Sequence, residues 1–238
     1  MLETIWTILA DGWGTMLLGG AVMTLLVGLC GMALGTLIGI AGATAKVNGP
    51  RWLQTLVSVY TTLVRSIPEL LIIYLLFFGT VQLANDLSDL FRWSGNLNHL
   101  FPFLVGVLGV GLVAGSYSVE VFRGALLAID PGQIEAARAI GMPAYKRLKR
   151  IIIPQMFWYA LPGANNVWQA ALKDTALISL IGLVELMRAS VLGAASTREP
   201  LALYLLAGLL YFIIGIGSQA AFGMLERYYG QGMVVKSS

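Results

Sequence analysis

The chain has 238 residues, of which 58% are hydrophobic and only 11% are charged. A soluble domain of this size could not bury so much apolar surface, so the composition excludes a soluble protein and predicts one embedded in a lipid bilayer. The net charge of +3 is small, and the distribution of the basic residues indicates membrane topology rather than nucleic-acid binding. The single cysteine, Cys30, excludes a disulfide bond within the chain.

The hydrophobic runs predict an all-α membrane protein that forms one domain over residues 1–238. Residues 1–15 contain no Lys or Arg, so we expect a short interfacial helix there rather than a cleaved signal peptide. A helix needs about 20 mostly apolar residues to cross a bilayer. The candidate spans are residues 16–43, about 53–83, 100–122, 155–193 and 201–225. The fourth is broken, and we expect a helix, a turn near Lys173 and a shorter helix that partly re-enters.

The basic residues predict the orientation of these spans. Ten of the 15 Lys and Arg residues lie in three connecting segments. They are Lys46, Arg51, Arg123, Arg138, Lys146, Arg147, Lys149, Arg150, Arg227 and Lys236. Because cytoplasmic loops of membrane proteins are enriched in Lys and Arg, we expect all three segments to face the cytoplasm. About five spans then place the N-terminus in the periplasm and the C-terminus in the cytoplasm.

A polar segment, "DPGQIEAARAIGMPAYKRLKRIIIP", lies between the third and fourth spans. In its first half, apolar residues recur at every third position: Ile134, Ala137 and Ile140. This spacing predicts a short amphipathic helix, which Asp130 can cap ahead of Pro131 in the first turn. Gly141 can end that helix in a left-handed conformation, and residues 142–150 are predicted to form a second short helix at an angle.

The same segment contains the pattern E-A-A, three residues, G, nine residues and I-x-L-P. The matching residues are Glu135, Ala136, Ala137, Gly141, Ile151 and Pro154, with Ile153 in the place of Leu. This pattern resembles the coupling-loop signature of ABC importer permeases, and we call residues 130–154 the coupling loop. A basic anchor on anionic headgroups would explain Lys146 to Arg150, but it would not explain the small residues of the pattern.

Other stretches extend the resemblance to polar amino-acid permeases over residues 15–230. They are "TLVRSIPELLIIYLLFFG", "YSVEVFRGALLAIDPGQIEAA", "PQMFWYALPGANNVWQAALKDTALISLIGL" and "LERYYG". The run from "ALPGANNVWQ" to "LKDTALISLIGLVEL" is most similar to permeases for histidine, lysine, arginine and ornithine, and for the opines octopine and nopaline.

The resemblance implies the type I ABC importer permease fold, in a bacterial inner membrane. It implies a subunit that forms the pathway for polar, in particular basic, amino acids or opines and that works by alternating access. Its implied partners are a second homologous permease, two ATPase subunits and a periplasmic substrate-binding protein. The residues implied in ATPase coupling are Glu135, Ala136, Ala137, Gly141 and Pro154.

The chain itself has no G-x-x-x-x-G-K-[ST] phosphate-binding loop. We therefore expect no enzymatic activity and no cofactor in this chain, with ATP and Mg bound by the partner ATPase.

Ionisable groups at membrane depth suggest where cargo binds, since each costs about 2–3 kcal/mol to insert. A basic cargo would favour carboxylates along its pathway, and Pro68 is expected to open the helix beside Glu69. The broken fourth region offers free backbone groups and polar side chains. Candidate substrate-binding residues are Glu69, Glu120, Gln169, Lys173, Asp174, Thr175, Ser179 and Glu185.

Several of these carboxylates have a structural alternative, because residues three or four apart share one face of a helix. The possible pairs are Arg65 with Glu69, Glu120 with Arg123 and Glu185 with Arg188. Lys173 and Asp174 could likewise pair with groups on other helices or lie at a turn exposed to water. The sequence leaves these alternatives open.

Two other classes of protein compete with a permease. A self-contained ion-coupled carrier or channel would need its own alternating-access machinery within about five spans, and it leaves the coupling pattern unexplained. An intramembrane enzyme would need paired aspartates, a Ser-His pair or a metal site within the spans. The single histidine, His99, lies near a span end, so we expect no metal site. Dependence of uptake on ATP would separate the permease from the carrier.

Overall fold

The computed structural model describes residues 2–91 and 100–230, and within them the side chains of residues 5–81 and 100–230. Every element in these ranges is a helix. In chain order they are α1 (Leu2–Ile8), the π-helical turn η1 (Leu9–Trp13), α2 (Gly14–Asn48), α3 (Arg51–Ser66), α4 (Glu69–Phe91), α5 (Leu100–Leu127), α6 (Pro131–Ala139), α7 (Ala144–Arg147), the π-helical turn η2 (Leu148–Ile152), α8 (Ile153–Asp174), the 3-10 helix η3 (Thr175–Ile181), α9 (Leu186–Thr197) and α10 (Pro200–Gly230). His99 and Lys236 lie outside the described residues.

Three of these helices are long and apolar enough to cross a membrane: α2 with the helical turns that precede it, α5 and α10. Two bent pairs each pass the same test when taken together, one formed by α3 and α4 and the other by α7 to η3 with α9. The described part of the chain therefore holds up to five spans. The expected all-α membrane protein with about five spans is confirmed.

Helices α2 and α5 cross at very short distance because α2 presents glycines at helical spacing. Gly31, Gly35 and Gly39 face Val110, Ala114 and Ser118 of α5, one pair after the other. A Cβ atom built on Gly39 would lie 2.5 Å from the Cβ of Ser118, which is closer than such atoms approach. In a bilayer, helices associate largely through close packing of this kind, so these glycines fix the centre of the bundle.

A Gly39→Val substitution is therefore expected to separate α2 from α5, at a cost of about 1–3 kcal/mol for overpacking. The measurement is the melting temperature of the detergent-solubilised protein, with the fraction that elutes as a single species. Gly19→Val is the matched control on the same helix, since a Cβ there meets nothing within 4 Å. Equal melting temperatures for the two variants would contradict this account of the packing.

The second span is broken at Pro68, and α3 and α4 meet there at 106°. A residue before proline is pushed out of the helical region, and Ile67 is extended, with φ −98° and ψ 137°. Pro68 has no N–H to give to the carbonyl of Val64. The next helix starts with the N–H groups of Leu71 and Ile72 on the carbonyl of Pro68. The predicted opening at Pro68 is confirmed, and it makes two helices of the span.

The fourth region is also broken, but at a different residue from the one predicted. The chain stays helical through Lys173 and continues from α8 into η3. It turns at Gly182, where φ is +93°, a conformation that glycine adopts without steric cost. Glu185 then caps α9, which is bent by 51° from the preceding helix. The expected turn near Lys173 is wrong in position, because Gly182 is the residue whose left-handed conformation ends the helix.

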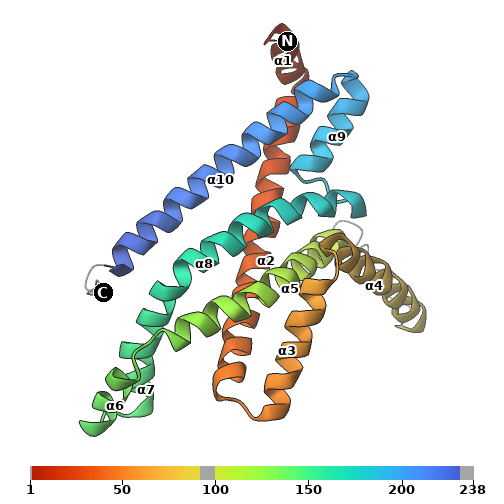
Figure 1. Cartoon of the computed structure of the whole chain (residues 1–238). Helices are drawn as coiled ribbons and strands as arrows, with labels where there is room; N and C mark the ends of the chain where they lie inside the picture. Colours follow the sequence, from red (N-terminus) through yellow and green to blue (C-terminus); the bar gives the residue numbers. More distant parts are fainter. Residues whose placement is uncertain (1, 92–99, 231–238) are drawn as a thin grey trace.

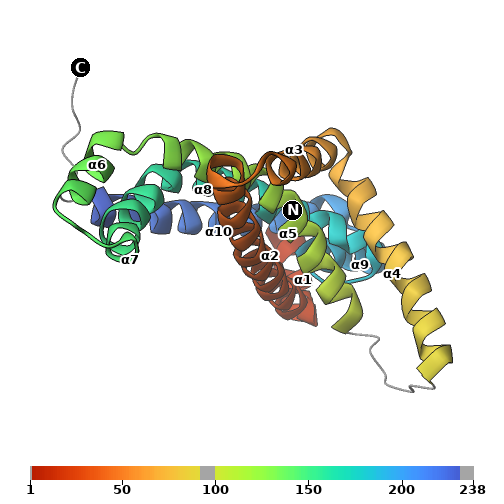
Figure 2. The same ribbon diagram turned by 90° about the horizontal axis from the view of Figure 1, so that it is seen from below.

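The two ends of the molecule carry different elements. Figure 1 shows the α2–α3 connection and helices α6 and α7 at the lower end, with α1 and the α9–α10 connection at the upper end. Figure 2 shows α4 on the side opposite to α6 and α7, where it leaves the other helices. The coupling loop and the basic connection after α2 thus share one end, as expected if both face the same side of the membrane.

Candidate functional site

The coupling loop begins with a capped helix. The Oδ1 atom of Asp130 accepts a hydrogen bond of 2.8 Å from the N–H of Gly132, and Pro131 is the first residue of α6. A side-chain cap satisfies one of the free N–H groups of the first turn, and proline at this position loses no hydrogen bond. The predicted start of the helix is confirmed.

The end of α6 is a Schellman motif at Gly141, whose φ is +74°. The N–H of Gly141 donates to the carbonyl of Arg138, and the N–H of Met142 donates to the carbonyl of Ala137, both at 2.9 Å. These two bonds define the motif, and glycine is the residue that takes its left-handed position most easily. The predicted left-handed ending is confirmed. The second short helix is not separate, because α7 continues through η2 into α8 with a helical backbone.

The surface of this loop is exposed and partly apolar. Glu135 and Ala136 are exposed, and the side chain of Ile140 is 78% exposed. Further exposed apolar side chains follow in the next helix: Tyr145 and Leu148. Ala137, in contrast, is buried within the chain, so a contact with another protein would use Glu135 and Ala136 rather than the whole E-A-A triplet. Pro154 is half-buried near the start of α8.

The break at Pro68 brings Glu69 to the η3 region. Glu69 is the first residue of α4, which packs against η3, the helix that directly follows Asp174. Lys173, which precedes Asp174 in the chain, is exposed. Arg65 does not share a helix face with Glu69 across the 106° bend. The guanidinium of Arg65 lies 4.7 Å from the ring centroid of Tyr117 instead.

Three other candidates from the same region are hydrogen-bonded or buried inside the chain. Gln169 donates to the carbonyl of Gly215 and to the hydroxyl of Ser218, both at 3.2 Å, and so ties α8 to α10. Thr175 is buried and donates to the carbonyl of Leu172 at 2.7 Å. Ser179 is buried in η3. Among the candidates of this region, Lys173 is therefore exposed and Asp174 is half-buried.

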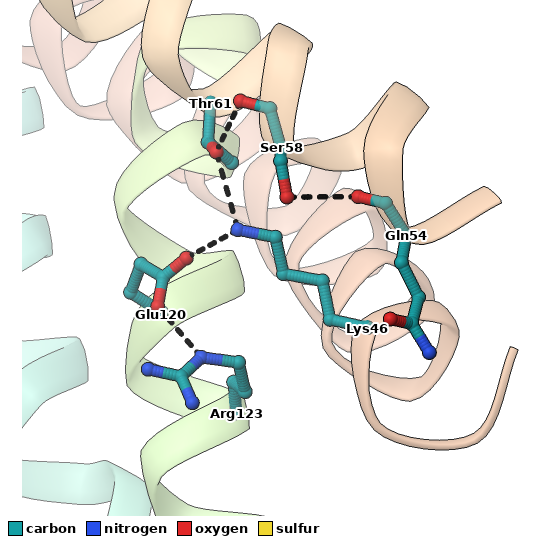
Figure 3. A network of polar contacts seen from close by, with 6 residues as sticks. All are labelled: Lys46, Gln54, Ser58, Thr61, Glu120 and Arg123. Carbon is teal, nitrogen blue, oxygen red and sulfur yellow. Dashed lines mark hydrogen bonds and ion pairs between the residues drawn. The ribbon is translucent and has the colours of Figure 1, made fainter. Parts of the chain in front are cut away.

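Glu120, near the C-terminal end of α5, lies in a polar network (Figure 3). Its Oε2 atom accepts a bond of 2.8 Å from Nε of Arg123, and its Oε1 atom lies 2.7 Å from Nζ of Lys46. The same Nζ lies 3.4 Å from the hydroxyl of Thr61 on α3. The pairing with Arg123 that the sequence left open is present, and the second cation comes from α2.

Glu185 is enclosed where α2, α9 and α10 meet. Its side chain has no exposed surface and accepts the N–H groups of Met187 and Arg188, at 2.8 and 2.7 Å. The hydroxyls of Thr24 and Tyr211 donate to it as well, at 3.3 and 3.1 Å. The carboxylate therefore contacts the backbone of Arg188 and acts as the N-cap of α9.

The structure thus packs α4, which begins at Glu69, against η3, which follows Lys173 and Asp174. Glu120, Glu185 and Gln169 are held by other contacts within the chain. Residues that sequence reasoning missed are Lys46, Thr24, Tyr211 and Tyr117. Only Lys46 gave a weak signal, because a lysine in the last turn of a long apolar helix needs a partner.

With this geometry in place, comparisons with known proteins identify the family. Residues 35–230 match the family of binding-protein-dependent transport system inner membrane components. The chain belongs to this family. It is an inner-membrane permease of the polar amino-acid ABC transporters, a non-catalytic transport subunit that works with a substrate-binding protein and an ATPase. Membrane components of this family bind no cofactor themselves.

Relatives of this permease cover nearly its whole length. It is 44% identical over 223 residues to the octopine transport system permease protein OccQ of Rhizobium radiobacter, and the matched region covers 94% of each chain. It is also 44% identical to the nopaline transport system permease protein NocQ of Agrobacterium fabrum, covering 93% of this chain and 94% of the relative. The histidine/lysine/arginine/ornithine transport system permease protein HisQ of Salmonella typhimurium is 37% identical, over 93% of this chain and 96% of HisQ.

Solved structures agree with the fold of the permease. A crystal structure of an amino acid ABC transporter with histidines superposes with a TM-score of 0.75 at 26% identity, over 92% of this chain and 96% of that chain. An inward-facing methionine transporter, MetNI, shares the fold with a TM-score of 0.61 at 18% identity, over 96% and 99% of the two chains. The expected permease fold is confirmed.

Proposed function

We propose that this permease imports basic amino acids or opines and is driven by ATP hydrolysis on separate subunits. The single observation that carries the choice of cargo is that the break at Pro68 packs α4, whose first residue is Glu69, against η3, which follows Asp174. Two carboxylates held near each other at membrane depth repel, and a cationic side chain between them relieves that repulsion. The names of the relatives, which are permeases for octopine, nopaline and basic amino acids, support the same cargo.

The remaining groups of a bound amino acid have partners near this carboxylate pair. Lys173 is exposed next to Asp174 and offers a cation to the carboxylate of the cargo. The extended backbone at Ile67 and the 3-10 turns of η3 offer free backbone groups for its amine, as discontinuous helices do in transporters. We assign the cargo site to Glu69, Lys173 and Asp174, with Thr175 and Ser179 in its wall.

The coupling loop receives the ATPase in this proposal. The capped helix α6 and its Schellman turn present Glu135, Ala136, Gly141 and Ile140 at one end of the molecule. The exposed apolar residues of this loop, Ile140, Tyr145 and Leu148, support a contact with another protein. Movement of α6 would rock the attached spans between inward-open and outward-open states. This end would be cytoplasmic, with the N-terminus in the periplasm, because the basic segments lie there.

We further propose a heterodimer of two homologous permeases with two ATPase subunits, in which residues 1–238 act as one domain. Helix α4 supports the pairing of permeases, because it leaves the other helices and exposes Leu71, Leu75 and Phe78. Lipid covers the remaining apolar surface of the spans.

The test is uptake into proteoliposomes that contain this chain, the second permease, the ATPase and the binding protein. Arginine uptake should require ATP inside the vesicles and should stop when the ATPase subunit is replaced by a hydrolysis-deficient form. Sodium and proton gradients should not drive uptake when ATP is absent. Uptake by this chain alone along an ion gradient would contradict the proposal and favour a self-contained carrier.

A further inference from the structure

The network around Glu120 joins three helices at the end of the molecule that carries the coupling loop. Lys46 belongs to α2, Thr61 to α3, and Glu120 and Arg123 to α5 (Figure 3). The ammonium of Lys46 is the centre of the network, because it lies 2.7 Å from the carboxylate and 3.4 Å from the threonine hydroxyl. A single cation therefore connects α2, α3 and α5.

Helix α5 passes directly into the coupling loop. Three residues, Ala128, Ile129 and Asp130, separate it from α6. The N–H of Ala128 still donates to the carbonyl of Gly124 at 3.0 Å, and Ile129 is buried in a cluster with Phe122 and Met156. The connection between α6 and α5 is thus short, hydrogen-bonded and packed, so a displacement of α6 moves the end of α5 with it.

Helix α3 leads in the other direction, to the break at Pro68 and to Glu69. Two further polar contacts hold α3 against α5. The hydroxyl of Tyr60 donates to the carbonyl of Leu112 at 2.6 Å, and Arg65 lies over the ring of Tyr117. The ammonium of Lys46 adds α2 to this pair of helices. A continuous series of contacts therefore runs from α6 through α5 to α3 and the cargo site.

We propose that Lys46 and Glu120 are positioning residues for coupled transport, whose ion pair makes α2, α3 and α5 move as one body when α6 is displaced. The proposal rests on the proposed coupling role of α6. It reassigns Glu120 from cargo binding to coupling, because each of its carboxylate oxygens already has a cation of the chain itself as partner. A basic cargo would have to displace one of these cations to reach it.

The burial of this ion pair makes it sensitive to the loss of one partner. The side chain of Lys46 is 14% exposed and that of Glu120 is 28% exposed. Removing one member of such a pair leaves an unpaired charge in a poorly solvated place, and the helices then separate to admit water or another counterion. The resulting helices can still pack through their glycines, so assembly and coupling can be measured separately.

The network around Glu185 provides the matched control. It is also polar and buried, and Thr24 connects it to α2. It connects α2 to α9 and α10 instead, and neither of those helices leads directly to α6. A Thr24→Val substitution should therefore lower the melting temperature of the complex without changing its coupling.

The experiment compares Lys46→Met, Glu120→Gln, Lys46→Arg and Thr24→Val in the reconstituted complex. The measured quantity is the amount of arginine transported per ATP hydrolysed. We expect Lys46→Met and Glu120→Gln each to lower this ratio about tenfold, the size of a typical coupling energy between sites. The KM for arginine should not change, because neither residue contacts cargo. Lys46→Arg keeps the cation and should keep the wild-type ratio.

An unchanged ratio in Lys46→Met would overturn the inference. If Lys46→Met does not assemble, Glu120→Gln decides, because it removes the charge of the other partner and keeps the shape of the side chain; a normal ratio in that variant would overturn the inference as well. A wild-type complex without ATP-driven uptake would instead refute the proposed function. The two failures are therefore distinguishable.

Discussion

A Gly141→Val permease is expected to insert into the membrane normally and to lose ATP-driven uptake. Gly141 has a φ of +74° and closes the Schellman motif at the end of α6. A β-branched residue in this left-handed conformation costs on the order of 1–3 kcal/mol. A Cβ on Gly141 would meet nothing within 4 Å, so the backbone conformation and not crowding causes the defect. The strained turn would reorient Ile140 and the exposed face of α6.

Two controls isolate this cause. Gly141→Asn should retain most of the uptake, since asparagine tolerates the left-handed region far better than valine does. Gly124→Val places the same side chain on the neighbouring part of α5, where a Cβ also meets nothing within 4 Å and the backbone is helical. The measurements are the amount of permease in the membrane, co-purification of the ATPase and arginine uptake. Wild-type uptake by Gly141→Val would show that this turn does not position the ATPase contact.

The coupling loop was predictable because its signals are local. Asp130, Pro131 and Gly141 each act on a hydrogen bond or a dihedral angle within a few residues, and all three adopt the conformation expected of them. The break at Pro68 is predictable for the same reason, since a proline acts on its own N–H and on the residue before it.

The roles of the membrane carboxylates were not predictable, because their partners are far away in the sequence. Glu120 bonds Lys46, 74 residues away, and Glu185 bonds Thr24, 161 residues away. Reasoning from helical spacing finds partners only three or four residues away, such as Arg123. The packing of α4, which begins at Glu69, against η3, which follows Asp174, also depends on tertiary structure, because α4 is bent by 106° from α3.

Removing the charge of Glu69 is expected to impair the transport of basic cargo more strongly than any other change at the proposed site. Glu69→Gln keeps the shape of the side chain and leaves one carboxylate, Asp174, for the cationic group of the cargo. An unpaired cation at membrane depth is strongly disfavoured. We expect kcat/KM for arginine to fall about 10-fold to 100-fold, which corresponds to about 1.4–2.8 kcal/mol. The affinity of the binding protein for arginine should not change, because that site lies on another chain.

Citrulline makes this test specific for charge, since it has the length of arginine but a neutral end group. Wild-type permease should prefer arginine over citrulline in the translocation step, and Glu69→Gln should lose most of that preference while its membrane level stays normal. Glu199→Gln is the matched control, because Glu199 is an exposed carboxylate at the α9–α10 connection, away from η3 and α4. The double variant Glu69→Gln with Asp174→Asn should abolish the preference, since no carboxylate then remains to pair with the guanidinium. If Glu69→Gln transports arginine with the normal rate and apparent affinity, the cation of the cargo is not held by this pair, and the cargo site has to be sought elsewhere along the pathway.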